Sequence, residues 1–275
     1  MKIEYSPGIM PGARIDLDKY KDKPKLPRLE TYQPVLKEKM AVLSCLINEE
    51  YKQDFLSLDG RIVMTGEEAV SDSEKTLEYE KDWAQELGLS LEAYRDDKEK
   101  GSGTIAEMIT MVLLNKAIGK EFIIARASDH DDFHHGVDSV IINKKTGMVI
   151  CGFDEVVEDS ESHISENKKK EKMRKIAAKG GAEIKYGATI KDGELVRASF
   201  KNIPAFYLSL STPELKSLAE DIKNSVSGVT DNEEKIFNKL IASLKDQSLK
   251  LADNHELVAE AEIAISSLSN AFSSR

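Results

Sequence analysis

Residues 129–156 read DHDDFHHGVDSVIINKKTGMVICGFDEV, and this stretch decides which fold the sequence predicts. Two apolar runs within it, 137–143 and 148–156, flank the four residues 144–147. The last of these, Gly147, can adopt the positive φ that a four-residue hairpin loop needs at its end. The sequence therefore predicts a β-hairpin.

Both strands of this hairpin carry acids among apolar residues. Asp138 lies on the first strand, and Asp154 and Glu155 lie on the second. A carboxylate is costly to bury unless it is paired, hydrogen-bonded or bound to a metal. With a simple four-residue loop, Asp138 is opposite Phe153, so Glu155 shares its face. One β-bulge would reverse this, so both acids of the second strand remain candidates.

Together with this hairpin, the flanking sequence predicts an α/β (α+β) domain. The expected order is helix, strand, strand, strand, helix, strand, which is an αβββαβ core around a central mixed sheet. The predicted elements are an apolar helix over 104–119, a strand over 121–127, the hairpin, a basic helix over 168–179, and a fourth strand over 182–190.

Glu107 in the first of these helices has two interpretations. Thr104 and Glu107 have the Ser/Thr-x-x-Glu spacing of a capping box, in which the glutamate satisfies the helix N-terminus. Alternatively, Glu107 is a carboxylate directed from the helix towards a site. The sequence leaves both open.

This order resembles the core of the PD-(D/E)XK nuclease superfamily over residues 102–190, about a third of the chain. The resemblance rests on Glu107, the Gly-Val-Asp step that ends at Asp138, the apolar strand that ends in Asp154 and Glu155, and the basic helix. It implies that Asp138 is the central Mg²⁺ ligand, that Asp154 or Glu155 is the second, and that Glu107 is a ligand from the helix.

The function that the resemblance implies is metal-dependent hydrolysis of phosphodiester bonds, as in a DNA endonuclease using Mg²⁺ or Mn²⁺. Its chemistry is consistent with the acids. Mg²⁺ prefers oxygen ligands, keeps several waters and accepts phosphate oxygens. Bound near a phosphodiester, it polarises the phosphorus centre and lowers the pKa of an attacking water.

The lysine that the superfamily places two residues after the second acid is absent, because Val156 and Val157 occupy those positions. A lysine would have to come from elsewhere in the fold. We expect Lys172 or Lys185 to serve as the catalytic lysine, with Lys169 and Lys175 contacting substrate. The alternative is that these lysines form a solvated surface.

The loop 129–135, DHDDFHH, is a second polar cluster. Its histidines suit a transition metal, but their spacing matches no closed zinc site. We expect His134 and His135 to contact substrate or a second metal, with a plain solvated loop as the other interpretation. A metal-binding hydrolase of another class, built on this loop, remains an alternative.

Composition sets limits on the function. The net charge of −10 argues against a surface that is basic throughout, although the 168–179 segment supplies a local basic patch. No apolar run reaches the roughly 18 residues of a membrane span, and no signal-peptide centre is evident, so we expect a cytoplasmic protein without a membrane partner.

Four regions are predicted. They are an extended arm over 1–33, a helical addition over 34–100 that packs on the core, the nuclease-like core over 101–211, and helices over 212–275. The last helices carry apolar stripes that would cover the core or form a homodimer. A catalytically inactive nuclease-fold assembly protein that uses these helices is therefore the alternative function.

Overall fold

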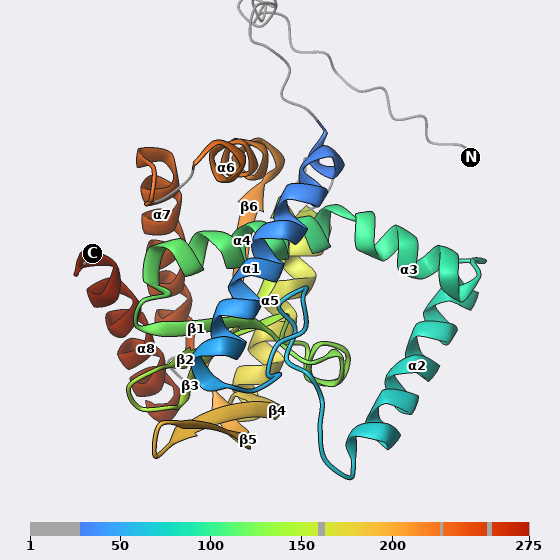
Figure 1. Ribbon diagram of the computed structural model, residues 1–275, viewed down its shortest axis with the longest axis horizontal. Helices are drawn as coiled ribbons and strands as arrows, with labels where there is room; N and C mark the ends of the chain where they lie inside the picture. The colour runs from blue at the N-terminus through green and yellow to red at the C-terminus, as the bar shows by residue number, and fades with distance from the viewer. Residues whose placement is uncertain (1–27, 159–162, 226–227, 252–254, 275) are drawn as a thin grey trace, which may run out of the picture.

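The computed structural model describes residues 28–158, 163–225, 228–251 and 255–274. Its centre is a four-stranded sheet in the order β1-β2-β3-β6 (Figure 1). The strands are β1 (Phe122–Arg126), β2 (Ser139–Asn143), β3 (Val149–Glu158) and β6 (Ala205–Ser211). The first three pair antiparallel and β6 pairs parallel to β3, so the predicted mixed α/β fold is confirmed.

The identity of the fourth strand differs from the prediction. The segment predicted to fill this place, β4 (Ala182–Lys191), pairs with β5 (Glu194–Ile203) in a separate two-stranded sheet. β6 takes the fourth place because it is buried along most of its length, as a strand inside a covered sheet must be. β5 is largely exposed, which suits a surface hairpin.

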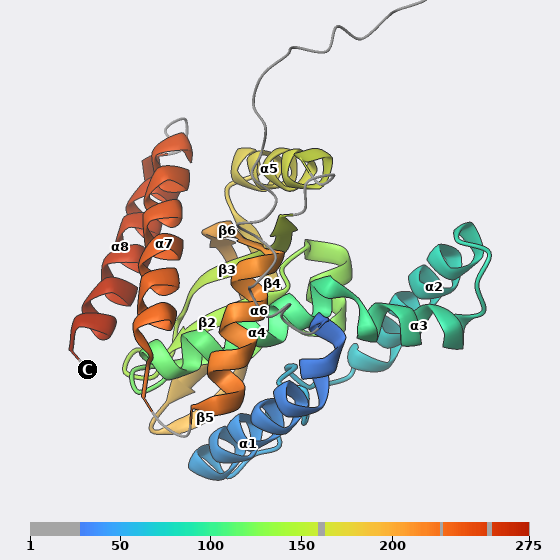
Figure 2. The ribbon, with the colours of Figure 1, turned by 90° about the horizontal axis from the view of Figure 1, so that it is seen from above.

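Helices cover the sheet in layers (Figures 1 and 2). The most buried is α4 (Ser102–Ile118), which lies between the sheet and the outer helices. Its apolar residues leave no polar face, as expected of a helix enclosed by its own protein. The other face of the sheet packs against the β4–β5 hairpin and Met173 of α5 (His163–Ala178).

The C-terminal helices are α6 (Thr212–Asn224), α7 (Asp231–Ser248) and α8 (His255–Ser273), with the short turn η4 (Leu249–Leu251) between the last two. The predicted apolar stripes of α6 and α7 pack into the cluster around α4, and so do Ala261 and Ile265 of α8. Ile263, also part of the predicted stripe of α8, is exposed instead. Among the helices of the described residues, none combines the length and the apolar character needed to cross a lipid bilayer.

The region before the core is helical, as predicted. It comprises η2 (Leu29–Tyr32), α1 (Gln33–Tyr51), α2 (Ala69–Glu86) and α3 (Leu91–Lys100). In both views α2 and α3 lie at the opposite side of the sheet from α7 and α8 (Figures 1 and 2). Residues 1–27 of the predicted arm lie outside the described residues.

The β2–β3 hairpin has the predicted turn, but its register contains a bulge. Asn143 N–H donates to Met148 O at 2.9 Å, and Gly147 has φ 71°. The register then shifts between Ile141 and Ile142, so that Ser139 is opposite Phe153. Continued by one residue, this register places Asp138 opposite Asp154.

Of the two registers that the sequence left open, the structure has the bulged one, so Glu155 does not share the face of Asp138. Phe153, two residues from Glu155, packs in the cluster around α4, whereas Val140, two residues from Asp138, packs in the cluster around β4 and β5. Since side chains alternate along a strand, Asp138 and Asp154 lie on one face and Glu155 lies on the other.

Substitution of Gly147 by alanine tests how the hairpin tip is held. A Cβ at this position would lie 2.1 Å from Ile190 N of β4, in addition to the strain of a positive φ. We expect Gly147→Ala to cost about 3 kcal/mol or more in the free energy of unfolding, measured by urea denaturation. Gly193→Ala is the matched control, since its φ is 82° but no atom lies within 4 Å, and it should cost only about 1 kcal/mol. Equal losses would show that the contact with β4 contributes nothing.

Candidate active site

Two carboxylates meet across the β2–β3 pair at the end where β2 begins. Asp138 directly precedes β2 and Asp154 lies within β3, and both are buried. Asp138 N–H donates to Phe153 O at 2.7 Å, and Glu155 N–H donates to the Asp138 carboxylate at 2.9 Å. The sheet backbone therefore fixes the position of Asp138.

The electrostatics at Asp138 show that several acids converge. Burial raises the pKa of the Asp138 carboxyl well above its usual value, and repulsion from Asp154, Glu155 and Glu107 raises it further. Each of these groups is a predicted site residue. A cation placed near Asp138 would relieve this repulsion.

Lys172 of α5 supplies one cation at this position. Its ammonium forms an ion pair with the buried Asp154 carboxylate. Gly136, two residues before Asp138, has φ 68°, and a Cβ there would lie 2.5 Å from Lys172 Nζ. The Gly-Val-Asp step thus leaves the space that the lysine occupies. Of the predicted candidates, Lys172 is the lysine that the fold brings to the acids.

Glu107 is not the partner in a capping box, so that interpretation is wrong. Gly101 is the N-cap of α4, and the Thr104 hydroxyl donates to Lys98 O instead. The Glu107 carboxylate binds Arg126 of β1 at 2.6 Å. It therefore projects from the helix towards the sheet end where Asp138 lies, as the second interpretation expected.

Glu155 belongs with Glu107 on the α4 face of the sheet. Its carboxylate accepts a hydrogen bond of 2.5 Å from the Ser139 hydroxyl. The two pairs of acids thus lie on opposite faces of one sheet end: Asp138 and Asp154 with Lys172, and Glu107 and Glu155 with the neighbouring Arg126.

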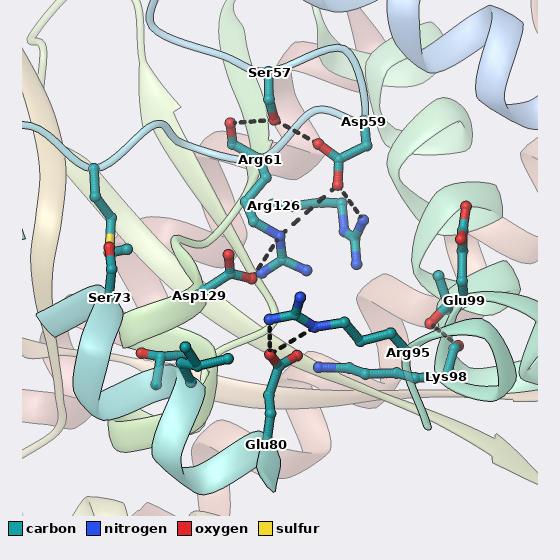
Figure 3. A pocket seen from close by; sticks show the side chains of 14 residues that line it. Ser57, Asp59, Arg61, Ser73, Glu80, Arg95, Lys98, Glu99, Arg126 and Asp129 are labelled. Carbon is teal, nitrogen blue, oxygen red and sulfur yellow. Dashed lines mark hydrogen bonds and ion pairs between the residues drawn. The ribbon is translucent and has the colours of Figure 1, made fainter. Parts of the chain in front are cut away.

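Arg126 also joins this centre to a charged cavity of about 520 Å³ between α2, α3 and the connection that precedes α2. Its guanidinium binds Asp59 at 2.9 Å as well as Glu107. Figure 3 shows Arg61 between Asp59 and Asp129, with Arg95 bound to Glu80 below it. Sequence reasoning missed these arginines, although a lone cation at the end of the apolar strand 122–126 was a signal for Arg126.

A larger groove of about 980 Å³ opens beside Asp138. Its basic lining comes from Lys172 and Lys175, both predicted site residues, and from Lys179. Its other lining residues include the acids Asp132, Asp138 and Glu171, the predicted His134 and His135, and the aromatic residues Trp83 and Phe133. The side chain of Lys169, the remaining predicted substrate contact, lies outside the described part of the chain.

The His-rich loop forms a π-helical turn, η3 (Asp131–His135), whose main contacts are structural. Asp131 is buried and accepts hydrogen bonds from the backbone N–H groups of Lys185 and Tyr186 at 2.7 and 3.1 Å. His135 Nδ1 lies 3.0 Å from the same carboxylate. This turn holds β4 in place, so the loop has a role that the sequence did not reveal.

Lys185 does not reach the acids. Its ammonium forms ion pairs with Asp72 and Glu68, and the Tyr186 hydroxyl also donates to Asp72 at 2.7 Å. Those hydrogen bonds raise the pKa of Lys185 above its usual value. Lys185 therefore ties β4 to α2.

The donor set at Asp138 fits Mg²⁺ by its chemistry. No group of three or more His, Cys, Asp or Glu side chains that could hold a metal ion occurs among the described residues, including the His-rich loop. Mg²⁺ is commonly bound by only one or two carboxylates, with waters and substrate phosphates completing its octahedron. Asp138 and Asp154 are such a pair.

Comparison of the chain with protein-family models, with curated proteins and with solved structures found no significant match in any of the three. Any functional proposal for this site therefore rests on its own residues.

The raised pKa of Asp138 predicts that removing its charge will stabilise the folded protein. When folding raises the pKa of a carboxyl, the folded protein becomes less stable as the pH rises from the unfolded pKa through the folded pKa. We expect the free energy of unfolding of Asp138→Asn, measured by urea denaturation in EDTA at pH 7, to exceed that of wild type by about 1 kcal/mol or more. The difference should be smaller near pH 4.

Asp131→Asn is the matched control, since Asp131 is also buried but accepts two backbone N–H hydrogen bonds, whereas Asp138 accepts one from Glu155. It should lose about 1–3 kcal/mol. A loss of stability in Asp138→Asn at pH 7 would contradict the repulsion at this site.

Proposed function

We propose that this protein is a metal-dependent nuclease that hydrolyses phosphodiester bonds of DNA as an endodeoxyribonuclease. The observation that carries the proposal is the placement of Lys172 on Asp154, opposite Asp138, beside a groove with basic residues on its lining. Two acids and a lysine at a strand end are the groups that phosphodiester hydrolysis needs.

Asp138 and Asp154 are the proposed metal ligands, since they share one face of the sheet. When bound, Mg²⁺ or Mn²⁺ would polarise the phosphate and lower the pKa of the attacking water. Glu107 and Glu155 lie on the other face, where Arg126 and Ser139 hold them. Their charges add to the negative potential that attracts a cation.

Lys172 is proposed to act in place of the strand lysine, whose position Val156 occupies in this chain. Its ammonium comes from α5 rather than from β3, but it reaches the acid that the missing lysine would accompany. Positioned there, it would hold a phosphate oxygen or the attacking water and offset the charge that develops during hydrolysis. Burial of Asp154 fixes the position of the ammonium.

The groove lysines are the proposed contacts to the strand. Lys172, Lys175 and Lys179 line the groove next to Asp138. Phosphate contacts of this kind supply most of the sequence-independent affinity for nucleic acid. A local basic lining serves this purpose even though the net charge of the chain is −10.

We further propose that the chain is a member of the PD-(D/E)XK superfamily. Support comes from the order α4, β1, β2, β3, α5, β6 and from the acids on α4, before β2 and on β3. The β4–β5 hairpin is then an insertion between α5 and the fourth core strand. The alternative assembly function has less support from the C-terminal helices, because most of their apolar residues pack in the chain's own core.

Cleavage of DNA by variants of single residues tests the proposal. We expect wild-type protein to cleave DNA with Mg²⁺ or Mn²⁺ but not in EDTA. Asp138→Asn and Asp154→Asn should each lower the rate by about 10³-fold, and Lys172→Met by about 10²-fold, because each removes a charge that acts on the transition state. Rates are measured by gel electrophoresis of a labelled oligonucleotide and of plasmid.

Lys185→Met is the matched lysine control, since Lys185 forms ion pairs away from the acids. It should lower stability but keep the rate per folded molecule. Folded wild-type protein that cleaves with neither metal would overturn the proposal, and so would Asp138→Asn that cleaves at the wild-type rate.

A further inference from the structure

Trp83 and Phe133 form an exposed aromatic pair beside the acids. Trp83 is the only tryptophan in the chain and lies near the end of α2. Its ring centroid lies 5.2 Å from that of Phe133 in η3, and the two ring planes are inclined by 30°. Both residues line the groove that also contains Asp138 and Lys172.

Core packing does not account for this pair. Trp83 remains 43% exposed, and neither ring belongs to the two apolar clusters found among the described residues. Lys98 Nζ lies 4.1 Å from the centroid of the Phe133 ring. The pair therefore presents aromatic surface, with a cation beside it, to the groove.

The charges of the same groove indicate what chemistry would cover these rings. Lys172, Lys175 and Lys179 extend along α5, and the side chain of Lys175 is 72% exposed. Aromatic rings with a row of cations match a ligand that alternates flat bases with phosphates. An apolar peptide would offer these lysines no anion, whereas phosphates can compete with the exposed Glu171 for Lys175.

We propose that the groove binds single-stranded DNA, with a base stacked on the Trp83–Phe133 pair and the adjoining phosphates on the lysines of α5. The inference rests on the proposed function and names its substrate class. A base in a duplex is already stacked on both faces, so only an unpaired base can stack on a protein ring. The strand would then place a phosphodiester next to Asp138 and Asp154.

Fluorescence of Trp83 provides a direct test, because no other tryptophan contributes to the signal. The titrations are carried out in EDTA, so that binding is followed without metal-dependent cleavage. We expect a ten-nucleotide thymidine strand to quench the emission, whereas an abasic strand of the same length and charge should not. A blunt duplex of the same length should also leave the emission nearly unchanged. Quenching by the abasic strand that equals that of the thymidine strand would overturn the proposal.

Variants separate stacking from charge. Trp83→Leu should weaken binding of a fluorescein-labelled single strand by about tenfold, measured by anisotropy, because the contribution of one stacked base is lost. Leu87→Ala is the matched control, since Leu87 is exposed at the end of the same helix and does not line the groove. Circular dichroism checks that both variants fold. An unchanged affinity in folded Trp83→Leu would overturn the proposal.

The two proposals fail in different ways. If strand binding depends on Trp83 but no metal supports cleavage, the nuclease proposal falls and the base-stacking site stands. If DNA is cleaved but Trp83→Leu binds and cleaves single strands as wild type does, the stacking site falls and the nuclease proposal stands.

Discussion

Two carboxylates, Asp138 and Asp154, are buried opposite each other on adjacent strands, and the cost of burying them, increased by their repulsion, is the constraint on which the rest of the site depends. An apolar sheet cannot hold such a pair without compensation. The chain supplies Lys172 from α5 and keeps Gly136 free of a side chain so that the lysine can approach. A metal ion bound there would complete the compensation.

The same electrostatics governs the neighbouring charges. Arg126 and Arg61 form ion pairs with Glu107, Asp59, Asp129 and Asp132 within one network beside the site. Asp72 and Asp131 bind Lys185 and Tyr186 and thereby join β4 to α2 and to η3. Ion pairs of this kind stabilise the fold. Around Asp138 the acids outnumber the cations, and this excess of negative charge is what would attract a metal ion.

Local patterns in the sequence were sufficient to predict most of the elements. The hairpin turn at Gly147 and the buried helix α4 follow from a glycine conformation and from apolar periodicity, which depend on nearby residues. Which strand completes the sheet was not predictable in this way. β4 and β6 both have strand patterns, and only the degree of burial of β6 between covering helices separates them.

The sequence by itself determined which residue types were available: acids within apolar strands, a basic helix and no lysine at Val156 or Val157. Tertiary structure alone decided how they meet. A single bulge between Ile141 and Ile142 set Asp154 rather than Phe153 opposite Asp138 and so moved Glu155 to the other face, because a shift of one residue reverses the alternation of side chains. The packing of α5 against the sheet brings Lys172 to Asp154, whereas an ion pair with Asp72 of α2 holds Lys185 away from the acids. Both contacts join residues far apart in the chain, so the sequence pattern could not predict them.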